Sequence, residues 1–194
     1  MGDGDFFLAS GALVSYKKTE IIIEAFRDMD EKLIVTGDGP EMKKLVYAAP
    51  DNVDFTGWLD REKLRDYYRN CKALIFAGVE DFGIIPVEVQ ACGRPVIAYR
   101  EGGLLDSVTE PTTEDYMNHR DFKSGLFFKE QSPRSIQEAV GIFQKMEFDS
   151  AAIARHAQKF SGMNFSRAIS KIVSNAYDDF DNNGKSGLDK RMLS

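Results

Sequence analysis

The chain has few of the residues that build metal sites and disulfide scaffolds. Its 194 residues include two cysteines and two histidines. Cys71 and Cys92 lie in unrelated contexts without metal-site spacing, and one pair is too few for a disulfide-stabilised fold. His119 and His156 are equally isolated in the sequence. We therefore expect reduced, structural thiols, histidines on the surface or in structural roles, and no protein-bound metal.

The sequence also lacks an excess of positive charge and any long apolar run. Lysine and arginine number 25 against 31 acidic residues, a formal net charge of −6. This balance argues against a general affinity for nucleic acid or anionic membranes. No apolar run approaches the roughly 20 residues of a membrane helix, and no signal-peptide pattern is present. The composition predicts a cytoplasmic protein that binds any anionic ligand through a few local groups.

What the sequence does contain is an alternation of short apolar runs with helical periodicity. Hydrophobic residues make up 43% of the chain, enough for a folded core. The alternation favours an α/β fold with a parallel sheet flanked by helices. The expected strands are 6–9, 33–36, 53–56, 73–76, 95–98 and 125–128. The expected helices are 19–29, 41–49, one capped by Asp60, 86–92, 133–146, 150–160 and 164–180.

The polar stretches set the expected boundaries of the domain. Residues 111–123 are polar and irregular, which predicts a surface loop. Residues 181–194, "DNNGKSGLDKRMLS", contain almost no apolar side chains and are expected to be a disordered tail. The sequence thus predicts one domain over residues 1–180, followed by this tail.

The stretch "EDFGIIPVE", from Glu80 to Glu88, places two carboxylates around an apolar segment between a strand and a helix. Pro86 suits the first helical turn, where no amide donor is needed. The free amides at such a helix start bind anions, phosphate above all. Gly83 allows close approach of a ligand to the backbone. Since ionised carboxylates only accept hydrogen bonds, they suit sugar hydroxyls, and the set describes a nucleoside diphosphate sugar.

Several stretches together resemble the family 4 retaining glycosyltransferases of the GT-B fold. They are "GALVSYKKTEIIIEAF", "KLIVTGDGP", "NVDFTGWLDREKLRDYYRNCKALIF", "EDFGIIPVEVQACGRPVIAYREGGLLDSV" and "FSGMNFSRAISKIV", in the family's order over roughly residues 6–180. The similarity is greatest to bacterial mannosyltransferases of O-antigen and capsule assembly. The resemblance implies a Rossmann-like sheet, the C-terminal, donor-binding half of such an enzyme.

The resemblance also implies roles for individual residues. Glu80 would be the catalytic residue, holding hydroxyls of the donor sugar, while Glu88 would take the ribose diol and Lys17 the diphosphate. The donor-binding residues would be Lys17, Gly37, Gly39, Leu59, Phe82, Gly83, Ile84, Ile85, Glu88 and Gly103, with Gly102 beside the last.

The implied enzyme transfers a sugar to a saccharide acceptor with retention of configuration and without metal or cofactor. The donor would be GDP-mannose, and the product a polysaccharide or lipopolysaccharide. The enzyme would act in the cytoplasm or peripherally at the inner face of the membrane. The N-terminal acceptor domain is absent from this sequence and would be supplied in cis or as a separate subunit.

Ala12 departs from the family pattern, which has an arginine at this place to pair with the lysine on the diphosphate. This departure leaves two alternatives open. One is a non-catalytic nucleotide-sugar-binding module or degenerate subunit, and the other is a GT-B relative such as a nucleotide-sugar epimerase. Trp58, beside the expected base-binding segment, is interpreted as a packing residue rather than a stacking one.

Overall fold

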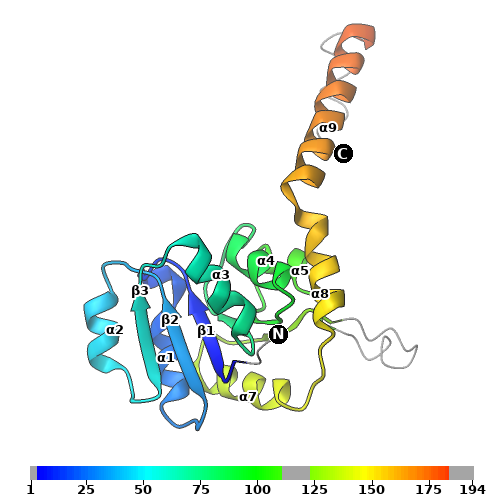
Figure 1. Ribbon diagram of the computed structural model, residues 1–194. Helices are drawn as coiled ribbons and strands as arrows, with labels where there is room; N and C mark the ends of the chain where they lie inside the picture. Colours follow the sequence, from blue (N-terminus) through cyan, green and yellow to red (C-terminus); the bar gives the residue numbers. More distant parts are fainter. Residues whose placement is uncertain (1–3, 111–122, 184–194) are drawn as a thin grey trace. The chain divides into compact units, whose positions relative to one another are not determined.

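The computed structural model of the protein describes residues 4–110 and 123–183 (Figure 1). It divides into two compact units, Met1–Ala157 and Gln158–Ser194. The predicted surface loop, apart from Lys123, lies outside the described residues, and so does the tail beyond residue 183. The predicted domain boundary at residue 180 therefore stays a prediction.

The described part of the larger unit contains a six-stranded, fully parallel sheet of order β3-β2-β1-β4-β5-β6. Every strand predicted from the sequence is present, with ends shifted by about one residue. The strands are β1 (Phe6–Ser10), β2 (Lys32–Thr36), β3 (Val53–Gly57), β4 (Leu74–Phe76), β5 (Val96–Tyr99) and β6 (Gly125–Phe128). This is the Rossmann-like α/β architecture that the sequence predicts.

Successive side chains along the strands enter two separate hydrophobic cores. Phe7 and Ala9 of β1 belong to one buried cluster, while Leu8 between them belongs to the other. This alternation follows from the pleat of a strand, which turns neighbouring side chains to opposite faces. Because both faces are buried, the strands read as continuous apolar runs in the sequence.

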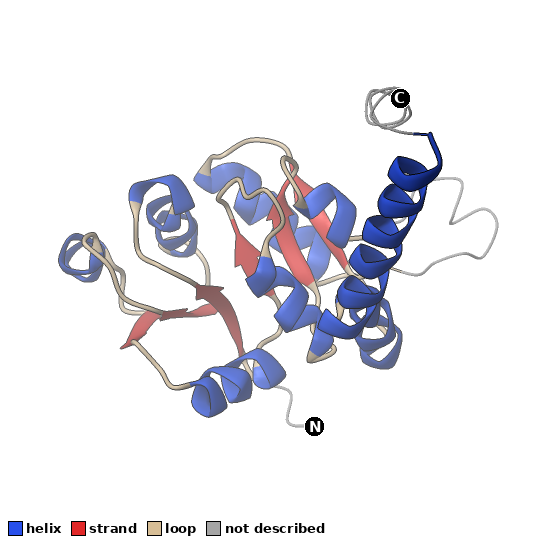
Figure 2. Cartoon of the chain, turned by 90° about the horizontal axis from the view of Figure 1, so that it is seen from above, coloured by secondary structure: helices blue, strands red, loops and turns tan. Residues whose placement is uncertain are grey.

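Helices cover both faces of the sheet, as the view from above shows (Figure 2). Ile22 and Phe26 of α1 and Ile136 of α7 complete one core, and Tyr68 of α3 and Val89 of α4 contribute to the other. The helices in the described part of this unit are α1 (Thr19–Phe26), α2 (Met42–Ala48), α3 (Arg61–Asn70), α4 (Ile84–Ala91), α5 (Leu104–Ser107), α7 (Pro133–Phe143) and α8 (Ser150–Ala157), with a 3-10 turn at Ser15–Lys17.

The helix boundaries show which local signals were informative. Asp60 caps α3 as predicted, because its carboxylate accepts a hydrogen bond from the Lys63 amide at 2.9 Å. Helices α1 and α7 end three residues before their predicted ends, at Phe26 and Phe143. The short helix α5 was not predicted. Cys71 is a free thiol at the end of α3, and burial raises its pKa to about 12.

The described part of the smaller unit contains a 3-10 turn, Gln158–Phe160, and the long helix α9, Gly162–Asn183. The predicted helix at 164–180 is thus confirmed and extends further at both ends. In the part of the chain that the structure describes, no helix is long and apolar enough to cross a membrane.

Candidate functional site

The strand order changes direction between β1 and β4, the two central strands of the sheet. In sheets of this kind, ligands bind beyond the carboxyl ends of the strands at the point of reversal. The segment after β1 leads to Lys17, and the segment after β4 leads through Glu80 to α4. The fold therefore brings both predicted binding segments to one edge of the sheet.

Helix α4 begins at Ile84, and its N-terminus faces this edge. Gly83 precedes it with φ 82° and ψ 72°, a left-handed conformation that favours glycine. A Cβ atom at this position would lie 2.7 Å from Cδ1 of Leu104. The first amides of a helix have no partner within the helix, so they are available to an anion. Pro86 lies in the first turn, as predicted.

Lys17 and Glu80 form an ion pair across this edge, although they are 63 positions apart in sequence. Only 15% of the lysine side chain and 26% of the glutamate side chain are exposed. The Lys17 ammonium also lies 5.3 Å from the ring centre of Tyr16 and 5.4 Å from that of Phe76. The aromatic rings and the carboxylate therefore hold the amine in place beside the start of α4.

A cavity of about 550 Å³ opens beside this ion pair, and we call it the Glu80 cavity. It combines one cation, two carboxylates, the helix start and an apolar wall. Its lining residues are Lys17, Phe76, Glu80, Asp81, Phe82, Gly83, Ile84, Ile85 and Pro86. Six of the residues predicted from the sequence therefore lie around one space.

A second cavity of about 350 Å³, the Glu88 cavity, lies over the carboxyl ends of β1, β2 and β3. It is lined by Ser10, Gly11, Ala12, Thr36, Gly37, Asp38, Trp58, Leu59, Leu64, Tyr68, Ile85 and Glu88. Ile85 lines both cavities, so the two spaces adjoin at the first turn of α4. Glu80 and Glu88 consequently line two adjoining cavities.

Two hydroxyl groups that the sequence reasoning missed lie in the Glu88 cavity. The Ser10 and Tyr68 hydroxyl oxygens are 3.3 Å apart. Burial raises the pKa of Tyr68 to about 12, and the nearby charge of Glu88 acts in the same direction. The phenol therefore stays protonated and can donate a hydrogen bond at neutral pH. Helical periodicity alone places Tyr68 on one face of its helix with Leu64, but it does not show where the side chain ends.

The predicted glycines differ in where the fold places them. Gly37 lines the Glu88 cavity, whereas Gly39 packs against the backbone of Leu13, where an added Cβ would lie 2.4 Å from the carbonyl oxygen. Gly103 lies behind the Glu80 segment and donates a hydrogen bond to the Glu80 carbonyl at 2.8 Å. Gly39 and Gly103 do not line either cavity, so their direct part in ligand binding stays a prediction.

The interpretation of Trp58 as a packing residue is wrong, because the residue is 76% exposed. It stands at the wall of the Glu88 cavity beside Leu59, which was predicted to border the ligand. Ala12 is also exposed at this wall, so the place of the family's arginine opens onto the site.

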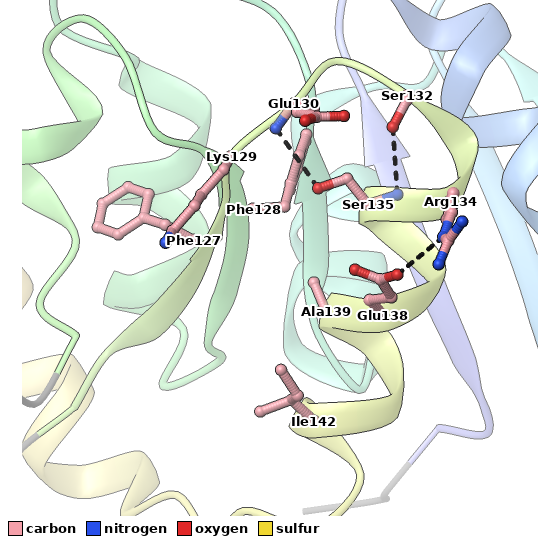
Figure 3. A pocket seen from close by; sticks show the side chains of 10 residues that line it. All are labelled: Phe127, Phe128, Lys129, Glu130, Ser132, Arg134, Ser135, Glu138, Ala139 and Ile142. Carbon is pink, nitrogen blue, oxygen red and sulfur yellow. Dashed lines mark hydrogen bonds and ion pairs between the residues drawn. The ribbon is translucent and has the colours of Figure 1, made fainter.

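A third cavity, of about 550 Å³, lies between β6 and α7 (Figure 3). Several polar side chains of this cavity make hydrogen bonds or ion pairs within α7. Ser132 caps α7 by accepting a hydrogen bond from the Ser135 amide at 3.3 Å, and Arg134 pairs with Glu138 at 3.0 Å. None of the predicted site residues line this cavity, and its ionic side chains lie mainly in solvent.

Among the described residues there is no group of three or more histidine, cysteine or acidic side chains that could hold a metal ion. Among the residues that line the two cavities, positive charge comes from the Lys17 ammonium and from the partial charges of the α4 amides. The arrangement is therefore able to bind an extended, anionic, hydroxyl-bearing ligand through amides, one amine and two carboxylates.

Curated proteins with similar sequences are named as glycosyltransferases. A protein of Methanocaldococcus jannaschii described as an uncharacterized glycosyltransferase is 31% identical over 72% of this chain and 38% of its own length. A GDP-mannose-dependent alpha-mannosyltransferase of Corynebacterium glutamicum is 35% identical over 60% of this chain and 28% of its own length. The chain thus spans well under half of these relatives.

Solved structures share the fold. The crystal structure of Anabaena HepE in complex with UDP and glucose superposes with a TM-score of 0.71 at 19% identity, over 89% of this chain and 49% of HepE. At that identity the likeness concerns the fold alone. A family model described as "Glycosyl transferases group 1" matches residues 2–160. With most of its length matched, the chain belongs to the glycosyl transferases group 1 family.

Proposed function

We propose that this chain is the donor-binding half of a retaining glycosyltransferase that moves a sugar from a nucleoside diphosphate sugar to a saccharide acceptor. The observation that carries the proposal is the pair of cavities that adjoin at Ile85, with Glu80 in one and Glu88 in the other. The sugar would occupy the Glu80 cavity, the nucleoside the Glu88 cavity, and the diphosphate the helix start between them.

The protein groups then have separate tasks. The amides at the start of α4 and the Lys17 ammonium neutralise the diphosphate, and this stabilises the negative charge that grows on the leaving phosphate. Glu80 accepts hydrogen bonds from sugar hydroxyls, while Glu88 accepts them from the ribose diol. The leaving phosphate serves as the base that takes the acceptor's proton. In this mechanism no metal ion or cofactor takes part.

The acceptor would bind in an N-terminal domain, present in cis or as a separate subunit. Exclusion of water from the reacting centre requires closure of two such domains. We therefore expect no steady sugar transfer by this chain alone. The proposed donor is GDP-mannose and the proposed product a polysaccharide or lipopolysaccharide, with the enzyme in the cytoplasm or peripherally at the inner face of the membrane.

Ala12 favours a second candidate function, a non-catalytic nucleotide-sugar-binding module. The charge of Lys17 is already paired with that of Glu80. Without an arginine at position 12, the site therefore has less positive charge to bind a diphosphate than a site that contains this arginine. A module of this kind would bind donors but would not transfer sugar even when supplied with its acceptor half.

Calorimetric titration with GDP, GDP-mannose, UDP and UDP-glucose, with and without a chelator, tests the proposal. We expect the protein to bind nucleotides without metal and to bind the guanine nucleotides more tightly than the uracil nucleotides. The variant Glu88→Ala should bind both GDP and UDP more weakly. The lost hydrogen bonds to a charged group correspond to roughly 1.5–3 kcal/mol. A strict requirement for magnesium, or no binding of any nucleotide at millimolar concentration, contradicts it. Sugar transfer after addition of the acceptor half separates an enzyme from a binding module.

A further inference from the structure

We propose that the indole of Trp58 stacks on the base of the bound nucleotide and supplies most of this chain's affinity for the base. The inference rests on the proposed function, because it assigns one residue within the same donor site. It starts from an exposed aromatic side chain that the core does not use.

Trp58 exposes 76% of its surface, which is unusual for a side chain with so much apolar area. The backbone on both sides of it is fixed. Gly57 ends β3 with φ 68°, and Asp60, two residues after Trp58, caps α3 through the Lys63 amide. The ring is therefore presented to solvent from a short connection between two regular elements.

The Glu88 cavity has a polar side and an apolar side. Glu88, Ser10 and Tyr68 provide a carboxylate and two hydroxyls near the end of β1. Trp58 and Leu59 follow the end of β3, and Leu64 lies on the helix after them.

Strands β3 and β1 are separated only by β2. Neighbouring strands are about 4.8 Å apart, so the two sides of the cavity are roughly 10 Å from each other. This is the length of a nucleoside, with the ribose at the carboxylate and the base at the indole. Because the indole is held at the rim, a planar base can enter beside it with one face covered.

Stacking on an aromatic side chain tolerates every base, but the gain grows with the overlapping ring area. A purine offers two fused rings and a pyrimidine offers one. Trp58 should therefore favour purine nucleotides, in agreement with the proposed guanine donor.

A different role is contact with a partner protein, in which case Trp58 would contribute nothing to nucleotide affinity.

The protein contains one tryptophan beside seven tyrosines, so emission excited at wavelengths that tyrosine does not absorb reports on Trp58 alone. Titration with GDP and UDP should quench or shift this emission, with the larger change for GDP. Pyrophosphate, which has no base, should bind at the helix start without changing the emission. Calorimetry on the same samples measures binding independently of the fluorophore.

The variant Trp58→Ala should lose roughly tenfold or more in GDP affinity, less in UDP affinity, and none in pyrophosphate affinity. Trp58→Phe should keep part of the GDP affinity, because a smaller ring remains. Tyr47→Ala is the matched control, since Tyr47 is an aromatic residue that is 94% exposed but outside both cavities. Its nucleotide affinities should equal those of the unchanged protein.

The outcomes separate the inference from the function on which it rests. If nucleotides bind by calorimetry but the emission stays constant and Trp58→Ala keeps its GDP affinity, the stacking role is overturned while the donor site stands. If neither nucleotides nor pyrophosphate bind, the donor site is overturned and the stacking role with it. An equal loss for GDP and pyrophosphate in Trp58→Ala also overturns the stacking role, because it would show general damage to the site.

Discussion

Replacing Glu80 with glutamine is expected to tighten the binding of GDP, although Glu80 belongs to the proposed site. In the structure the Lys17 ammonium is paired with the Glu80 carboxylate, and both side chains are largely buried. A diphosphate at the start of α4 needs the charge of Lys17 and is repelled by that of Glu80. Glutamine keeps the shape of the side chain and removes the negative charge, so it should free the amine for the ligand.

The magnitude is worked out for a phosphate charge placed about 8 Å from the Glu80 carboxylate. Two unit charges roughly 8 Å apart interact by about 2 kcal/mol at an effective dielectric constant near 20. Part of this is offset because the uncharged amide still competes weakly for the amine. A gain of about 1 to 2 kcal/mol corresponds to roughly five- to thirtyfold in affinity. With GDP-mannose, the lost hydrogen bonds from sugar hydroxyls to a carboxylate, about 1.5–3 kcal/mol, should cancel or reverse the gain.

Calorimetry with GDP and GDP-mannose at low and high salt measures this effect. Asp81→Asn is the control, since this substitution removes one negative charge from the same cavity. Unlike Glu80, Asp81 is exposed. Its effect on GDP affinity should be smaller and should vanish at high salt, because exposed charges are screened.

Unchanged or weaker GDP binding by Glu80→Gln would refute the competition between the ion pair and the diphosphate. If both Glu80→Gln and Asp81→Asn increase GDP affinity by the same factor, the increase comes from the change in net charge. The ion pair between Glu80 and Lys17 would then have no role in GDP binding. If Glu80→Gln increases the affinity for GDP-mannose as much as that for GDP, Glu80 does not bind the sugar.

Three further predictions concern the same edge of the sheet. Ala12→Arg should tighten GDP binding by roughly five- to a hundredfold in a salt-sensitive manner that requires Lys17, as calorimetry on the single and double variants will show. Gly83→Ala should lower the unfolding free energy in urea by about 1–2 kcal/mol, because φ 82° strains an L-residue; no loss would mean that the turn relaxes. Burial raises the folded-state pKa of Tyr68 from 10.0 to about 12, so the folded chain keeps a proton that the unfolded chain loses. The unfolding free energy should therefore fall between pH 10 and 12, and Tyr68→Phe should reduce that fall by roughly 2 kcal/mol relative to the unchanged protein.

The strands and the main helices could be predicted because their signals are local. The run from Phe6 to Ala9 is apolar on both faces, and it becomes a central strand with Phe7 and Leu8 in opposite cores. Asp60 predicts the start of a helix because its carboxylate can accept a hydrogen bond from a free amide of the first turn. Helix α5 has only four residues, too few for a periodic pattern, and it was missed for that reason.

The components of the candidate site were predicted, but their mutual contacts were not. Glu80 and Lys17 were recognised through a resemblance of motifs and assigned to different parts of one ligand. Their direct pairing joins residues 63 positions apart and is a property of the folded sheet. The exposure of Trp58 was misjudged for the same reason, since burial depends on what packs over a residue rather than on its neighbours in sequence.

The two glycines after β5 allow the backbone to pack closely behind the Glu80 segment. An added Cβ at Gly102 would lie 2.5 Å from the Glu80 carbonyl oxygen, and one at Gly103 would lie 2.1 Å from that of Asp81. A side chain at either position therefore requires the Glu80 segment or the glycine backbone to move. The position of the Glu80 segment at the Glu80 cavity thus depends on two residues that do not line that cavity. If the Glu80 cavity holds the donor sugar as proposed, a substitution at Gly102 is expected to alter the space for that sugar without replacing any side chain that lines the cavity.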